Sequence, residues 1–376
     1  MIHDLNDLLN KVDEPYKSAF FNHRDTALSS YATVGENGAH REAILGTLDL
    51  YPSRALCLTR PNDIIQLSPK LEKLWSFIQS HYRRVGLKVT QDVIWSDNLD
   101  EYKASIYSRY DFSGFMGTEE LLEAYGLRHI QVASTLNSKT KFMELCVELG
   151  ISTPETFWSR DYLSKKDNFP VSGYFKADES VSGLGVLKYD SPEELDDLVK
   201  AYRSSSWQVQ RDVMPVKFLN LQYTLDDFSW KALAMTEQIL NGNSHVGNQF
   251  PSSVSIETRD YGNILDHAQK FGFRGVLGLD VLVDAEGKSY VLECNPRLNG
   301  STYPTVTAKR LGVVKWLAIS VHSSFRDISE ILERHSFDGN KGVVVFNWGA
   351  LLSDKAGIMI AGDDNYQKEI MSLFTS

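Results

Sequence analysis

FRGVLGLDVLVDAEGKSYVLECNPRLNGS, residues 273–301, is the most informative segment of the sequence. Two apolar runs, 279–283 and 289–293, flank the turn residues Ala285-Glu286-Gly287, and this pattern predicts an antiparallel hairpin. Asp280 lies in the first run, Glu293 ends the second, and Asn295 follows two residues later. The valine and leucine neighbours make both strands core-facing. Acidic residues in such strands are seldom buried without a partner.

The register of this hairpin decides whether the two acids meet. With an even-numbered loop, Asp280 lies directly opposite Glu293, and their Cβ atoms are about 5 Å apart on one face. A three-residue loop puts them on opposite faces instead, and the sequence leaves both registers open. Adjacent carboxylates repel each other unless a cation lies between them, and such oxygen ligands suit Mg²⁺. The alternative is that both acids are simply solvated beside the hairpin.

A second group of polar residues lies upstream. The segment 138–150 has the pattern of an amphipathic helix, and Lys139 opens it. A strand is predicted at 173–177, with Lys176 near its end, and the Gly/Ser loop DESVSGLG follows at 178–185. Glycines let a backbone approach phosphates closely, and the N–H groups of a loop can cradle them. The loop matches no complete phosphate-binding motif, and a lone lysine is more often a solvated surface group.

The rest of the chain alternates strands and helices. In the N-terminal part, strands are predicted at 55–59 and 92–95, with a helix at 71–85 between them, which favours a partly parallel sheet. Beyond the Gly/Ser loop we expect a capped helix at 191–204 and a strand at 207–213. A β-rich stretch follows, and 341–352 is predicted to form a strand and a turn before a closing helix.

Composition excludes several classes of protein. The chain has 376 residues, of which 42% are apolar, so it is long enough for two or three structural units. A net charge of −10 disfavours a nucleic-acid ligand. Three scattered cysteines, at 57, 146 and 294, indicate neither disulfides nor a zinc site. The acidic N-terminus is unlike a signal peptide, and no apolar run is long enough for a membrane helix. A cytoplasmic protein is therefore expected.

Taken in order, these segments resemble the ATP-grasp superfamily over about residues 137–301. The order is Lys139, Lys176 with its small-residue loop, WQVQRDV at 207–213, and then Asp280 with Glu293-Cys-Asn295-Pro-Arg297. The flanking segments 241–251 and 342–363, with the N-terminal unit, resemble ligases that have a pre-ATP-grasp domain, such as pheganomycin-type peptide ligases. There are departures: Gln210 stands where many relatives have glutamate, Lys217 where an acidic ribose contact is common, and Asp280 where glutamate is commoner.

The resemblance implies a role for each matched residue. Phosphate and base contacts would come from Lys139, Lys176, Glu179, Ser182, Gly183, Gly185, Gln210, Arg211 and Val213. Asp280, Glu293 and Asn295 would hold two Mg²⁺ ions, for which Mn²⁺ can substitute. Catalytic roles would fall to Arg297, which steadies an acyl phosphate, and to Asn299 and Ser301. His245 and Asn248 are candidates for the acceptor pocket, although a structural role for His245 is an equal alternative.

The resemblance also implies an α/β (α+β) ATP-grasp fold in three units. These are an N-terminal pre-ATP-grasp domain at 1–136, a central and lid subdomain at 137–213, and a metal-binding C-terminal subdomain at 214–376. The implied activity is ATP-dependent ligation of a carboxylate to an amine through an acyl phosphate, releasing ADP and phosphate. The alternatives are an ATP-grasp phosphotransferase and a non-catalytic nucleotide-binding regulator. Expected partners are small carboxylates with amines or short peptides, without nucleic acid or membrane, and a homodimer is left open.

Overall fold

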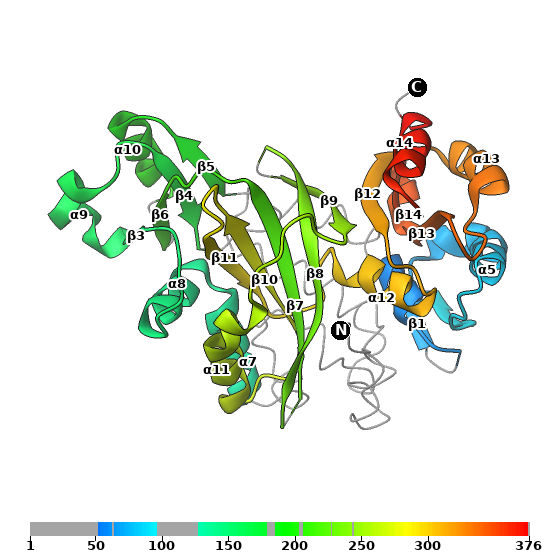
Figure 1. Ribbon diagram of the computed structural model, residues 1–376, viewed down its shortest axis with the longest axis horizontal. Coiled ribbons are helices and arrows are strands. Elements are labelled where there is room, and N and C mark those ends of the chain that lie inside the picture. The colour runs from blue at the N-terminus through cyan, green and yellow to red at the C-terminus, as the bar shows by residue number, and fades with distance from the viewer. Residues whose placement is uncertain are drawn as a thin grey trace.

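The computed structural model describes residues 52–61, 64–95, 127–178, 185–202, 206–226, 228–242 and 244–374. Helices and strands are arranged around three sheets of two, eight and four strands. In Figure 1 the four-stranded sheet lies at one end, the eight-stranded sheet crosses the middle, and the C-terminal helices lie at the other end. The expectation of a mixed α/β fold is confirmed.

The N-terminal part contains the predicted parallel pairing, but only one of its two strands, 92–95, lies where the sequence predicts it. Strand β1 (Ile64–Leu67) pairs with β2 (Asp92–Trp95), and α5 (Trp75–Arg84) connects them after the 3₁₀ helix η3 (Pro69–Leu74). The strand predicted at 55–59 is wrong, because this segment belongs to the 3₁₀ helix η2 (Pro52–Leu58). A short apolar run does not distinguish a strand from a buried helical turn. Here Thr59 N–H and its hydroxyl both donate to the Leu56 carbonyl.

The eight-stranded sheet has the order β11-β10-β7-β8-β9-β12-β14-β13. Its strands are β7 (Lys217–Leu225), β8 (Trp230–Asn241), β9 (Ser244–Phe250), β10 (Gly275–Val283), β11 (Ser289–Asn295), β12 (Trp316–His322), β13 (Gly342–Asn347) and β14 (Lys355–Ala361). All the pairings within this sheet are antiparallel.

Alternation along β7 and β10 gives this sheet one apolar face and one polar face. Leu219, Leu221 and Tyr223 join a buried core with residues of the helices α7 (Leu127–Asn137), α8 (Lys139–Glu148) and α11 (Gly262–Lys270). These helices lie on one side of the sheet in Figure 1. The intervening Asn220 and Gln222 point to the opposite face, since successive side chains alternate along a strand.

The four-stranded sheet has the order β3-β6-β4-β5 and its own aromatic core. Its strands are β3 (Thr156–Trp158), β4 (Gly173–Ala177), β5 (Val186–Tyr189) and β6 (Trp207–Arg211), and the longest helix beside it is α10 (Pro192–Ala201). Short helices η4 (Ser159–Asp161), α9 (Tyr162–Lys165) and η5 (Lys166–Asn168) link β3 to β4. Helix α8 contacts both β6 and β11, so it joins this sheet to the larger one.

The C-terminal part shares a core with the N-terminal segment. Buried residues of η2, β1 and α5 pack with those of β13, β14 and α12 (Thr302–Arg310) in one cluster. The remaining elements are η6 (Thr258–Tyr261), α13 (Phe325–His335), η7 (Gly349–Ser353) and α14 (Asp364–Ser372). The division at 136 and 213 stays a prediction. Over the described ranges, no helix has the length and apolar character needed to cross a membrane.

Candidate functional site

A β-bulge brings Asp280 and Glu293 opposite each other. Asp284 N–H donates to the Lys288 carbonyl, so the turn itself has three residues, an odd number. The pairing of Val283 with Ser289 would then place Asp280 opposite Leu292. The register instead shifts between Asp280 and Val281, so that Leu292 is the extra residue and Asp280 pairs with Glu293. The acids therefore meet, but through a bulge and not through the even loop considered from the sequence.

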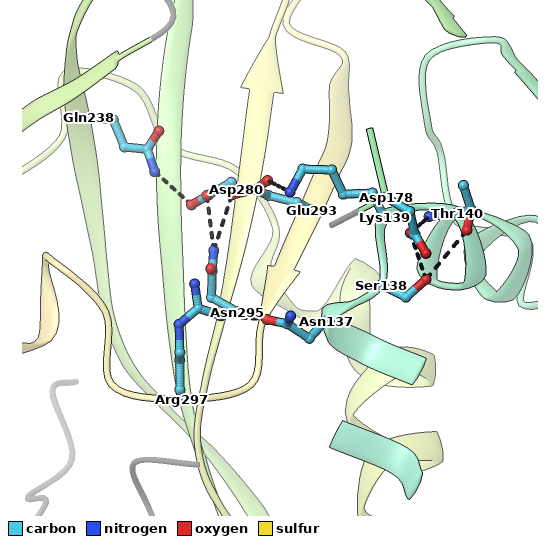
Figure 2. Close-up of polar contacts among 10 residues, drawn as sticks. All are labelled: Asn137, Ser138, Lys139, Thr140, Asp178, Gln238, Asp280, Glu293, Asn295 and Arg297. Carbon is cyan, nitrogen blue, oxygen red and sulfur yellow. Dashed lines mark hydrogen bonds and ion pairs between the residues drawn. The ribbon is translucent and has the colours of Figure 1, made fainter. Parts of the chain in front are cut away.

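The Asp280 carboxylate is held by three amides on the polar face of the sheet. Its Oδ1 accepts from Asn220 Nδ2 at 2.7 Å and from Gln238 Nε2 at 2.6 Å. Its Oδ2 accepts from Asn295 Nδ2 at 3.1 Å. Figure 2 shows Gln238 and Asn295 approaching this carboxylate from different sides. The donors fix the carboxylate in one orientation.

Glu293 is tied to the start of helix α8. Lys139 Nζ lies 3.3 Å from Glu293 Oε2, as Figure 2 shows. Burial and the adjacent Glu293 charge raise the pKa of Asp280 well above its usual range. Burial also raises the pKa of Glu293, but the positive charges of Lys139, Lys176 and Arg297 outweigh it and leave that pKa lowered. The pair is therefore electrostatically unequal, with Glu293 the more strongly ionised member.

The donor set fits a hard divalent cation. Asn295 Nδ2 lies 3.1 Å from an Asp280 oxygen and 3.4 Å from Glu293 Oε1, so one amide group bridges both carboxylates. An amide rotated by half a turn presents its oxygen at the same place, and the two orientations are not distinguished by shape. Two carboxylates and one amide oxygen suit Mg²⁺, which usually keeps waters or phosphate oxygens as its other ligands. No cluster of three His, Cys, Asp or Glu residues that could hold a metal occurs in the described ranges.

The polar face of the four-stranded sheet holds the second predicted lysine. Lys176 pairs with Gln208 in the β4–β6 register and is only 8% exposed. Burial lowers the pKa of Lys176 to about 8, against the attraction of the Glu293 charge. Gln210 Nε2 contacts Met143 Sδ at 3.2 Å and Thr156 Oγ1 at 3.3 Å. The Gln208 amide is buried and has no hydrogen-bond partner in the part of the chain described.

Asp178 connects the end of β4 to the start of α8. Its Oδ1 accepts from Ser138 Oγ and from Thr140 N–H, both at 2.8 Å. Ser138 is also the N-cap of α8 and accepts from Lys141 N–H. A carboxylate is favourable beside the exposed N–H groups of a helix N-terminus. These contacts, drawn in Figure 2, join the residue that follows β4 to the start of α8, where Lys139 lies.

The other predicted nucleotide contacts are less closely grouped. Glu179, Ser182 and Gly183 lie outside the described residues, and Gly185 has a positive φ of 77°. The Arg211 guanidinium pairs with Glu155, at 2.6 Å from Nε to Oε2, and both side chains are exposed. Val213 is half-buried beyond the end of β6. Lys217, the departure at the expected ribose contact, forms an ion pair with the buried Glu237.

Residues 297–301 form a loop that leads into Thr302, the first residue of α12, and hydrogen bonds hold this segment (loop 297–302) in place. Arg297 Nη1 donates to Asn137 Oδ1 at 2.5 Å, which joins the loop to the end of α7 (Figure 2). Asn299 Oδ1 accepts from Ser301 N–H at 3.1 Å. Asn299 Nδ2 is buried and has no partner among the described residues. A Cβ atom at Gly278 would lie 2.2 Å from this nitrogen, so a larger residue there would displace the Asn299 side chain.

The two candidates for the acceptor pocket contact each other. A ring nitrogen of His245, Nε2, lies 2.7 Å from Asn248 Oδ1, and Asn248 Nδ2 donates to Thr236 Oγ1 at 3.1 Å. His245 is exposed, whereas Asn248 is buried. A Cβ at Gly300 would lie 3.1 Å from the His245 ring, so His245 borders the loop that holds Ser301.

Sequence reasoning missed several polar residues of this site. Asn220, Gln222 and Gln238 lie on strands β7 and β8, and Asp178 directly follows the last residue of β4. The alternation in LNLQYTL, residues 219–225, contains the relevant signal, since two amides alternate with large apolar residues. The sequence predicts a β-rich stretch there, but it does not show that the polar face of this strand contacts Asp280 and Ser301.

Comparison with known proteins agrees with this geometry. Residues 136–301 match a family model described as ATP-grasp domain. A curated protein of Niallia circulans, the [butirosin acyl-carrier protein]–L-glutamate ligase, is 35% identical over 92 residues. That match spans 23% of this chain and only 22% of the length of the relative.

Solved structures match over much more of the chain. The ADP complex of an N5-carboxyaminoimidazole ribonucleotide synthetase has a TM-score of 0.61 at 13% identity, and the match covers 85% of this chain and 93% of that one. The biotin carboxylase domain of the Hydrogenobacter thermophilus 2-oxoglutarate carboxylase, bound to MgADP and bicarbonate, has a TM-score of 0.51 at 15% identity, covering 80% and 81%. The resemblance of residues 136–301 to an ATP-grasp domain and the predicted ATP-grasp fold are therefore confirmed.

Proposed function

We propose that the chain is an ATP-dependent carboxylate–amine ligase that works through an acyl phosphate and releases ADP and phosphate. The proposal depends above all on one observation. Asp280 and Glu293 lie opposite each other with Asn295 between them, and Lys139 contacts Glu293. Positive side chains next to a pair of carboxylates suit a metal–phosphate complex, in which each charge has a counter-charge.

In this mechanism the protein mainly binds and orients its substrates. Bound Mg-ATP would supply the γ-phosphoryl group, and the metal would neutralise charge on the attacking and leaving oxygens. Asp280, Glu293 and Asn295 would hold the metal, while Lys139 and Lys176 would bind phosphate oxygens. Arg297 would face the carboxylate that becomes phosphorylated, and the loop 297–302 would border the amine. Fixed charges of this kind stabilise a transition state without reorganising during the reaction.

The amine and the carboxylate are identified here only by class. Small acids with amines or short peptides remain the expected substrates. The Niallia circulans relative is named as a ligase of L-glutamate and an acyl-carrier protein. An acyl-carrier protein is therefore a further class of acceptor to test. We also propose a cytoplasmic location.

A screen of carboxylate and amine pairs tests the proposed reaction. ADP release would be measured for each pair, with mass spectrometry of the products. We expect one pair to give ADP, phosphate and an amide in equal amounts, and Lys176→Ala to abolish this release. The exposed Arg326→Ala serves as the control and should behave as the wild type. AMP with pyrophosphate would refute the acyl-phosphate route, and a phosphorylated hydroxyl product would indicate a phosphotransferase.

A further inference from the structure

We propose that Asn220 is a positioning residue that links the metal-binding carboxylate of Asp280 to the substrate loop 299–302. The inference rests on the proposed function, because it takes Asp280 as a metal ligand. Asn220 lies on β7, is 3% exposed and uses both ends of its amide. Its Nδ2 donates to Asp280 Oδ1 at 2.7 Å, and its Oδ1 accepts from Ser301 Oγ at 2.5 Å.

Ser301, the loop residue that contacts Asn220, is itself held in place by a further hydrogen bond. Ser301 Oγ accepts from Gln222 Nε2 at 2.7 Å, and Thr302 Oγ1 donates to Gln222 Oε1 at 2.6 Å. Ser301, Thr302, Gln222 and Asn220 are all buried. Buried hydrogen bonds in a connected network depend on each other, because breaking one leaves a buried group unpaired. A movement of Asp280 is therefore transmitted through Asn220 to a loop with little freedom to absorb it.

Chemistry fixes the orientation of the Asn220 amide. When a cation binds Asp280, the ionised carboxylate only accepts hydrogen bonds, so the NH₂ end of the Asn220 amide faces Asp280. The amide oxygen then accepts from the Ser301 hydroxyl. The reversed amide would set its oxygen against a carboxylate oxygen, where neither atom has a proton to donate. Binding a cation at Asp280 keeps that carboxylate ionised, so the metal and the loop favour the same amide orientation.

Gln238 provides an internal comparison. It donates to the same Asp280 oxygen at 2.6 Å, but from strand β8. Within the ranges that the structure describes, it makes no hydrogen bond to the loop 299–302. Gln238 and Asn220 therefore have the same role toward the metal carboxylate and differ in their connection to the loop. Substitutions at the two positions separate metal binding from coupling.

The test measures binding of Mn²⁺ with ADP and hydrogen exchange of the loop. Free Mn²⁺ would be followed by electron paramagnetic resonance in the presence of ADP for the wild type, Asn220→Ala and Gln238→Ala. Each variant loses one hydrogen bond to a carboxylate, so Mn²⁺ affinity should fall by about tenfold in both. Exchange of the amides in residues 299–305 should slow on adding Mn²⁺ and ADP in the wild type and in Gln238→Ala. This protection should be absent in Asn220→Ala, compared at equal metal occupancy.

Ser301→Ala cuts the same link from its other end. This variant should bind Mn²⁺ nearly as the wild type does, yet lose the loop protection, so it tests the coupling even if Asn220→Ala does not fold. Equal protection in Asn220→Ala, Ser301→Ala and Gln238→Ala would overturn the proposal. A wild type that binds no Mn²⁺ with ADP would instead refute the metal site of the proposed function. The two failures are therefore distinguishable.

Discussion

At the scale of single residues, the two opposed acids have different surroundings. Asp280 receives three amide N–H groups but has no positively charged partner in direct contact among the described residues. Glu293 has Lys139 at 3.3 Å, so its charge is compensated before any metal binds. Because burial and the Glu293 charge raise the pKa of Asp280, ionisation of this group costs folding free energy at neutral pH. Removing one acid is therefore not equivalent to removing the other.

The substitution Asp280→Asn should separate catalysis from folding. The pKa of Asp280 is higher in the folded protein than in the unfolded chain, so a neutral side chain at this position removes an unfavourable charge from the folded state. We expect the metal-free protein to unfold in urea at the same or a higher concentration than the wild type. Mg²⁺-dependent ADP release should fall by about a hundredfold or more, because transition-state charge loses its metal. A variant that unfolds more easily but turns over normally would show that Asp280 is structural.

The sequence predicts the charged residues of this site better than its amides. Asp280, Glu293, Asn295 and Lys139 have ordered spacing in the chain, and the structure brings them together. Asn220 is distant in sequence from Asp280, and its role depends on the pairing of β10 with β7. A single sequence does not give that pairing. The hairpin register was likewise undetermined, because the bulge at Leu292 has no sequence signature.

At the scale of elements, helix α5 is joined to strand β13 through a buried histidine. His81 is 3% exposed, and its Nε2 accepts from the Val345 N–H at 3.1 Å. Its ring packs edge-on against Trp348, with centroids 5.2 Å apart. Burial, with a contribution from the Arg84 charge, lowers the pKa of His81 to about 3. The helix was predicted from its apolar spacing, but the histidine contact depends on a strand more than 250 residues away.

This histidine should make folding stability depend on pH. The folded pKa lies below the unfolded value of about 6.5, so the unfolded chain binds the proton first. The contribution of neutral His81 to the free energy of unfolding is fully present above about pH 6.5 and is lost as the pH falls toward 3. We expect His81→Gln to reduce the difference in unfolding free energy between pH 7 and pH 5 by about 2 kcal/mol. Urea unfolding at several pH values measures this. The exposed His322→Gln is the control, and an equal effect there would exclude His81 as the cause.

At the scale of the whole molecule, one side chain at the end of helix α12 joins the C-terminal part of the chain to the N-terminal part. Arg310, at the end of α12, donates from Nη1 to the carbonyls of Cys57 at 2.6 Å and Thr59 at 2.8 Å. Its Nη2 donates to the Lys88 carbonyl. One planar guanidinium thus satisfies carbonyls from two stretches of the N-terminal part. The Cys57 and Thr59 carbonyls lie at the end of the 3₁₀ helix η2, and they accept from Arg310 and not from a neighbouring strand.

Replacing Arg310 should weaken the whole molecule. Arg310→Ala leaves partly buried carbonyls without a donor, so we expect the free energy of unfolding to fall by about 2–3 kcal/mol. Arg310→Lys should recover only part of this, since an ammonium does not reproduce the planar fork. Urea unfolding followed by tryptophan fluorescence measures both. Arg326→Ala removes an exposed pair with Glu330, and its free energy of unfolding should be close to that of the wild type. Equal losses at both positions would mean that the Arg310 contacts contribute little.

The extra residue at Leu292 also constrains how this chain can vary in length. Adding or removing one residue in the turn 285–287 shifts every later residue of β11 by one place, which exchanges its two faces. Glu293 would then leave Asp280 if the bulge were retained. A change of two residues would keep Glu293 on the face of Asp280 but place it two positions away along β11. Of these changes, only a deletion of one residue that also removes the bulge returns Glu293 to its place opposite Asp280, so viable changes in turn length should be rare and of this kind.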